Sequence, residues 1–149
     1  MEVGFRRILF CTDFSQGAAN AFKYALKAAA LNHAKLFILH VIPEADAQFW
    51  KGYVVEDGKD LEQKATGTLH DKMQAEYLGQ IPEGVECETV YRVGGASQQI
   101  VDFARDNDIS LVVLGRPRPR FLRTFLYGSV ASRVARSVPC PLLVVPTGR

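Results

Sequence analysis

The sequence predicts an α/β protein built on a single doubly wound parallel sheet with helices on both faces. Short apolar runs of strand length alternate with amphipathic helical patterns in the order βαβαβαβαβ. This alternation is typical of parallel strands joined by right-handed helical crossovers. A length of 149 residues and an apolar content of 48% suit one domain over residues 1–149.

The first half of the chain predicts two strands and two helices. The run Arg7–Thr12 is a buried strand, and Lys35–Ile42 is a second one that a proline ends. Residues 16–32 between them are helical, residues 43–58 form a long loop, and residues 59–79 form another helix. The apolar stripe of the first helix comprises Ala18, Ala21, Phe22, Ala25, Leu26 and Ala29, and that of the second comprises Leu61, Ala65, Leu69, Met73 and Tyr77.

The second half predicts three strands and two helices. Val85–Val93 alternates as a half-exposed edge strand does, whereas Ile109–Leu114 is a continuous buried strand and Leu142–Val145 is the last strand. Residues 96–107 and 129–138 carry helical spacing. Their predicted inward residues are Ala96, Ile100, Phe103 and Ala104 in the first helix, and Val130, Val134, Ala135 and Val138 in the second.

Charge is distributed unevenly along the chain. Residues 1–108 hold 11 Lys/Arg and 16 Asp/Glu, a net charge of −5, whereas residues 109–149 hold seven Arg and no acid, a net charge of +7. The loop at residues 115–127 contains four of these arginines, Arg116, Arg118, Arg120 and Arg123, interleaved with Phe121, Leu122, Phe125 and Leu126. Two interpretations remain open: the block attracts an anionic ligand or partner, or it is a solvated loop that pairs with the acidic part.

Several protein classes find no support in the sequence. The three cysteines are scattered without a CxxC pair and are expected to be reduced thiols in a cytoplasmic protein. The histidines have no metal-binding spacing, no run of apolar residues suits a membrane span, and no catalytic motif occurs. His40 and Cys11 are expected to be packed within the fold rather than to act as base and nucleophile, and the small basic block makes nucleic acid an unlikely partner.

A ligand of a parallel sheet is expected beyond the carboxyl ends of the strands, which here means Thr12–Ser15, Val41–Pro43 and Gly115–Val130. Asp13 either accepts hydrogen bonds from a ligand or caps the following helix, a role that Ser15 can also fill. Gly115 either leaves room for a ligand or forms a turn. The start of the last helix, at Gly128, Ser129 and Val130, is either an anion site or an ordinary helix cap.

These residues resemble the universal stress protein family along essentially the whole chain. The segments that carry the resemblance are RRILFCTDFS, LFILHVI, VGGASQQIVDFARDNDISLVVLG and, most specifically, YGSVASRVARSVPCPLLVVP. The resemblance implies a five-stranded parallel sheet of strand order 3-2-1-4-5.

The resemblance also implies a nucleotide site. Many family members bind ATP through a loop written GxxGx9G[S/T], in which Gly115, Gly128 and Ser129 match while Arg118 stands at the second glycine. Arg118 either grips a phosphate or fills the pocket. Residues matching Asp13 and Val41 help hold ribose and adenine in such members. The predicted site for ATP or another adenine nucleotide, with Mg as a possible companion, is Thr12, Asp13, Val41, Gly115, Arg118, Gly128, Ser129 and Val130.

Two functions follow from the resemblance. One is a stress-response regulatory protein that binds an adenine nucleotide and is not an enzyme, although slow ATP hydrolysis stays open. The other is an interaction module of the same family that binds no nucleotide and acts through an unidentified protein partner. In both cases a homodimer is expected through Leu142–Val145, because an apolar edge strand tends to be paired.

Overall fold

A computed structural model of the chain describes residues 3–46, 68–116 and 129–147. The strands form one sheet of order β3-β2-β1-β4-β5, in which every neighbouring pair is parallel. The predicted fold class and strand order are confirmed. The strands are β1 (Arg7–Cys11), β2 (Lys35–Ile42), β3 (Cys87–Val93), β4 (Leu111–Gly115) and β5 (Leu142–Val145).

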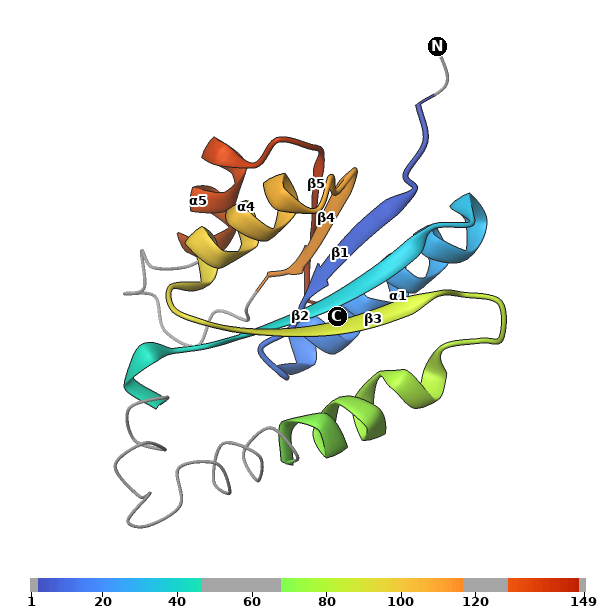
Figure 1. Cartoon of the computed structure of the whole chain (residues 1–149), viewed down its shortest axis with the longest axis horizontal. Coiled ribbons are helices and arrows are strands. Elements are labelled where there is room, and N and C mark those ends of the chain that lie inside the picture. The colour runs from blue at the N-terminus through green and yellow to red at the C-terminus, as the bar shows by residue number, and fades with distance from the viewer. Residues whose placement is uncertain (1–2, 47–67, 117–128, 148–149) are drawn as a thin grey trace.

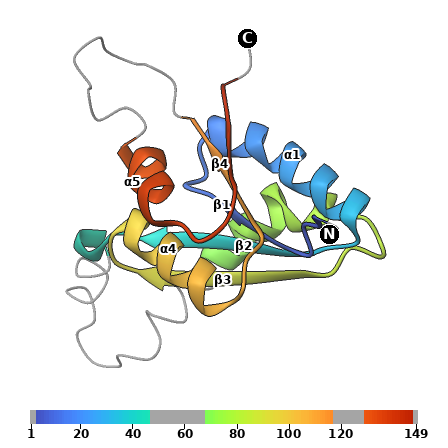
Figure 2. The same cartoon turned by 90° about the horizontal axis from the view of Figure 1, so that it is seen from above.

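Helices cover both faces of this sheet (Figure 1). Helix α1 (Gln16–Asn32) and the helical residues 68–76 pack on one face, and α4 (Ala96–Asp106) and α5 (Ser129–Ser137) pack on the other. Figure 2 shows α1 and α5 on opposite sides of β1 and β4. A 3-10 turn, η1 (Leu78–Gln80), follows the helix at 68–76, and residues 44–46 form one helical turn.

The core consists of two apolar clusters, one on each face of the sheet. On the α1 face, the rings of Phe10, Phe22 and Tyr77 pack with centroids 4.8–5.4 Å apart. Met73 and Tyr77 are fully buried there, as their helical spacing predicts, whereas Leu61 and Ala65 lie outside the described residues. The other cluster is built from Leu9, Leu39 and Val112 of the strands with Ile100, Phe103 and Val134 of the helices, among others.

Two strands start later than the apolar pattern predicts, and both shifts have a backbone cause. The Ile109 N–H donates to the Ala104 carbonyl at 3.0 Å and so closes α4, which leaves β4 to begin at Leu111. The Val85 N–H donates to Pro82 in a turn, so β3 begins at Cys87. In the part of the chain that the structure describes, strand β3 pairs only with β2 and is the sheet edge that its alternation predicts.

Two predicted inward residues of α5, Val130 and Ala135, are wrong. Ala135 is exposed, whereas Ala131, Val134 and Val138 face the core. These three residues have i, i+3, i+7 spacing, the pattern that a helix presents on one side. Val130 is 39% exposed and lies at the edge of a pocket.

The two long predicted loops are described only in part. Residues 47–58 and 117–127 lie outside the described residues, and with them the apolar and arginine side chains from Arg118 to Leu126. In the segments that the structure does describe, no helix has both the length and the apolar character needed to cross a membrane.

Candidate functional site

A pocket of about 230 Å³ opens at the carboxyl end of the sheet. It lies where β1, β2 and β4 end and where α4 and α5 begin, the position at which parallel sheets bind ligands. Its volume is just below the roughly 300–1,000 Å³ of drug-sized sites. The lining residues are Cys11, Thr12, Asp13, Ser15, Ala18, Leu39, Val41, Ala96, Ile100, Leu114, Gly115, Val130 and Ala131.

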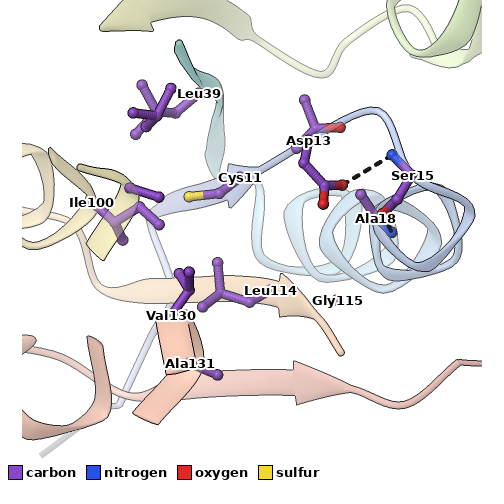
Figure 3. Close-up of a pocket in the computed structure, with 13 residues that line it drawn as sticks. Cys11, Asp13, Ser15, Ala18, Leu39, Ile100, Leu114, Gly115, Val130 and Ala131 are labelled. Carbon is purple, nitrogen blue, oxygen red and sulfur yellow. Dashed lines mark hydrogen bonds between the residues drawn. The ribbon is translucent and has the colours of Figure 1, made fainter. Parts of the chain in front are cut away.

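The inner part of the pocket is apolar. Figure 3 shows side chains from β1, β2, β4, α4 and α5 around one space. Two alanines, Ala96 and Ala131, stand in the first turns of α4 and α5, where larger residues would occupy that space. A wall of this kind suits a flat, largely apolar group such as a heteroaromatic ring.

The polar side of the pocket is the turn after β1. Ser15 is the N-cap of α1, and its hydroxyl accepts a hydrogen bond from the Ala18 N–H at 3.2 Å. Asp13 Oδ1 accepts one from the Ser15 N–H at 2.9 Å (Figure 3). Ser15, and not Asp13, therefore caps α1. The exposed Asp13 keeps its second carboxylate oxygen without a partner among the described residues.

Thr12 lies beneath this turn, with its polar groups already bonded. Its hydroxyl contacts the Tyr77 hydroxyl at 2.7 Å and accepts from the Phe14 N–H at 2.9 Å. Its carbonyl lies 2.8 Å from His40 Nδ1, and its N–H donates to Leu39. Although Thr12 lines the pocket, its hydroxyl is bonded to Tyr77 and to the Phe14 N–H, so its side chain stabilises the turn.

Gly115 has a structural role in addition to the two that the sequence leaves open. A Cβ on Gly115 would overlap the Gly17 carbonyl oxygen and lie 2.7 Å from its carbon and 3.0 Å from the Ala18 nitrogen. The glycine therefore permits the first turn of α1 to approach the end of β4. Because Ser15 and Ala18 belong to that first turn and line the pocket, this close approach brings α1 to the site.

Five of the predicted site residues come together around the pocket. These are Thr12, Asp13, Val41, Gly115 and Val130. Arg118 and Gly128 lie outside the described residues, and Ser129 begins α5 with a side chain that the structure does not describe.

The sequence patterns did not identify the apolar part of the pocket wall. Ala96 had a signal, since it follows Gly94 and Gly95 at the start of a helix on the binding side of the sheet. From the sequence pattern, Leu39, Ile100 and Leu114 are recognisable only as core residues.

Among the described residues, His40 and Cys11 are two titratable side chains at or near the pocket. The His40 ring is bonded to Thr12 and packs 4.7 Å from the Phe14 ring, so it is the satisfied, partly buried histidine that its strand position predicts. Burial raises the pKa of the Cys11 thiol well above its ordinary value, which disfavours the nucleophilic thiolate. Within residues 3–46, 68–116 and 129–147, no three His, Cys, Asp or Glu side chains gather as a metal site.

Comparison with known proteins identifies the family. A model of the universal stress protein family matches residues 4–146. The chain belongs to the universal stress protein family. Universal stress protein MJ0577 of Methanocaldococcus jannaschii is 27% identical over 97% of both chains, and YxiE of Bacillus subtilis is 26% identical over 95% of this chain and 99% of its own.

Solved structures of universal stress proteins have the same fold. The structure of MJ0577 is similar with a TM-score of 0.79 at 26% identity, covering 99% of each chain. That of UspA from Lactobacillus plantarum has a TM-score of 0.72 at 22% identity, covering 97% of this chain and 99% of its own. The fold expected from the resemblance is thus also the fold of known members.

Proposed function

We propose that this universal stress protein is a regulatory protein that binds an adenine nucleotide in the pocket at the carboxyl end of its sheet. The observation that carries the proposal is the juxtaposition of an apolar slot with a carboxylate that has one unpartnered oxygen among the described residues. A nucleoside presents the matching chemistry, a flat base joined to a sugar with hydroxyl donors.

Each part of the nucleotide finds a matching group. The slot beside Val41 suits the base, and the free oxygen of Asp13 suits a ribose hydroxyl. Helix α5 begins at Ser129, and its second residue, Val130, lines the pocket. A helix N-terminus attracts negative charge, so the phosphates belong on the side where α5 starts. Any Mg would accompany these phosphates.

Solved relatives indicate what this fold accommodates. One universal stress protein is described in complex with cAMP, at 23% identity and a TM-score of 0.65. Another, from Archaeoglobus fulgidus, is described in complex with dAMP, at 21% identity and a TM-score of 0.59. At these identities the likeness concerns the fold alone, so the proposal rests on the pocket of this chain.

The proposed role is that of a cytoplasmic stress-response sensor rather than an enzyme. The bonded His40 ring and the protonated Cys11 thiol are consistent with binding without turnover. Nucleotide occupancy would then signal by changing which conformation or partner the protein favours.

Isothermal titration calorimetry with ATP, ADP and AMP at millimolar concentration tests the proposal. We expect saturable binding, and Asp13→Ala should weaken it about 10- to 100-fold, the range for a hydrogen bond to a charged group. Asp71→Ala is the matched control, because Asp71 is also exposed but does not line the pocket. Absence of heat with all three nucleotides would refute the nucleotide function and leave the interaction module.

We also propose that two copies of the protein pair through β5. In the described sheet, β5 bonds only to β4, and its Leu143 and Val144 are 39% and 36% exposed. An apolar strand with an open edge is stabilised by pairing with another strand, and a second copy offers the same edge. Light scattering should give a dimeric mass at micromolar concentration. Val144→Lys should give a monomer, whereas Leu31→Lys on the exposed face of α1 should not.

Calorimetry, and not light scattering, separates the alternative function from the proposed one. Both functions predict a dimer, but an interaction module without nucleotide predicts no calorimetric signal.

A further inference from the structure

Tyr77 reaches the end of β1 from the face of the sheet on which α1 packs, and it does not line the pocket. It follows the helix at residues 68–76 and is 1% exposed, packed against Phe10 and Phe22. Its hydroxyl lies 2.7 Å from Thr12 Oγ1, within hydrogen-bond distance. A phenylalanine would fill the same apolar space, so packing alone does not account for the hydroxyl.

Thr12 connects Tyr77 to the turn that contains Asp13. The same Thr12 Oγ1 accepts a hydrogen bond from the Phe14 N–H at 2.9 Å. Phe14 has a φ of 62°, in the left-handed region that bulky residues rarely adopt. A conformation of this kind persists only where its surroundings hold it.

The Phe14 ring is enclosed on several sides. Its centroid lies 4.7 Å from that of His40 and 6.1 Å from that of Tyr77, and Lys72 Nζ lies 4.7 Å from it. His40 Nδ1 in turn lies 2.8 Å from the Thr12 carbonyl. Besides Thr12 itself, the side chains that fix the residues on both sides of Asp13 do not line the pocket.

We propose that Tyr77 is a positioning residue for the nucleotide: its hydroxyl, acting through Thr12, holds the left-handed turn that presents Asp13 to the pocket. The inference rests on the proposed function for the identity of the ligand. It adds that the affinity of the pocket depends on a buried side chain that does not line the pocket.

The binding test uses Tyr77→Phe, which removes the hydroxyl and keeps the ring. We expect it to weaken AMP binding about 2- to 10-fold, the range that one net hydrogen bond gives. If Tyr77 acts through Asp13, the same change in an Asp13→Ala background should weaken binding less than 2-fold. An equal loss in both backgrounds would overturn the proposal, as would unchanged affinity in the single variant.

Matched variants separate the hydroxyl from general stability. Met73→Leu alters a buried residue of the helix that precedes Tyr77 without changing the Tyr77–Thr12–Phe14 hydrogen bonds, and it should bind AMP as the unsubstituted protein does. Thr12→Val should lose as much AMP affinity as Tyr77→Phe does. Thr12→Ser keeps the hydroxyl and should bind AMP about as tightly as the unsubstituted protein. A loss of affinity in Met73→Leu equal to that in Tyr77→Phe would contradict a positioning role.

A measurement without ligand distinguishes failure of this inference from failure of the proposed function. Amide hydrogen exchange at Phe14 reports the bond to Thr12 directly. Tyr77→Phe should speed exchange at Phe14, and Met73→Leu should not. Unchanged exchange refutes the inference even if nucleotide binds. If Tyr77→Phe speeds exchange at Phe14 but the unsubstituted protein binds no nucleotide, then Tyr77 does stabilise the turn and the nucleotide function is refuted.

Discussion

Replacing Gly115 by alanine tests how the site is assembled. The added Cβ would overlap the Gly17 carbonyl oxygen and lie 2.7 Å and 3.0 Å from two further backbone atoms of α1. These neighbours are backbone within a helix, so they cannot turn aside as a flexible side chain does. The first turn of α1 must move, or β4 must bend.

Overpacking of this kind costs about 1–3 kcal/mol of folding free energy. For a chain of about 150 residues, each kcal/mol lowers Tm by about 2–4 °C, so Gly115→Ala should lower Tm by about 2–12 °C. Gly4→Ala is the control, since a Cβ there meets nothing within 4 Å. Thermal unfolding followed by circular dichroism measures both. A Tm for Gly115→Ala equal to that of Gly4→Ala would refute the close approach of α1 and β4.

Three further predictions concern the pocket and its supports. Ser15→Ala removes the N-cap of α1 and should lower the urea-measured free energy of unfolding by about 0.5–2 kcal/mol, whereas the exposed Ser132→Ala should change it little; equal effects would contradict the cap. Ala131→Leu fills the pocket and should weaken nucleotide binding at least about tenfold in calorimetry, while Ala135→Leu on the exposed side of α5 should not; unchanged affinity in both would place the ligand elsewhere. Burial raises the pKa of Cys11 above its ordinary 9.0. At a pH above 9 the folded protein therefore still holds a thiol proton that the unfolded chain has already lost. The free energy of unfolding should therefore fall above about pH 9 by at most about 1.4 kcal/mol per pH unit from this thiol, and Cys11→Ala should flatten that decline; parallel curves would contradict the assignment.

The strands were predictable from the sequence because buried strands carry continuous apolar runs, whereas their order was predicted only by the resemblance to the universal stress protein family. The run from Ile109 to Leu114 nevertheless gave the wrong start for β4, since apolar character does not reveal that the Ile109 N–H closes α4. Ala135 was misplaced for a related reason. An alanine fits either side of a helix, and which side is buried depends on how α5 lies against the sheet.

The candidate site was predictable where chemistry is local to the chain. Asp13 and Ser15 stand together after a strand, so both of their roles were visible as alternatives, and the hydrogen bond from Ala18 decides between them. The contact between Gly17 and Gly115 was not predictable, because it joins two distant elements through atoms that all residues share. The bond from Tyr77 to Thr12 was hidden in the same way, since helical spacing reveals that Tyr77 faces inward but not which atom it meets.

The most direct test of the account is a nuclear magnetic resonance titration of the ¹⁵N-labelled protein with AMP and with ATP. If nucleotide binds in the pocket, chemical-shift changes should concentrate at the turn from Thr12 to Ser15, at Ala96 and at Ala131, with little change at the far end of α1 near His33. Saturating shifts confined to residues that do not line the pocket, or no shifts at millimolar nucleotide, would contradict the proposed function.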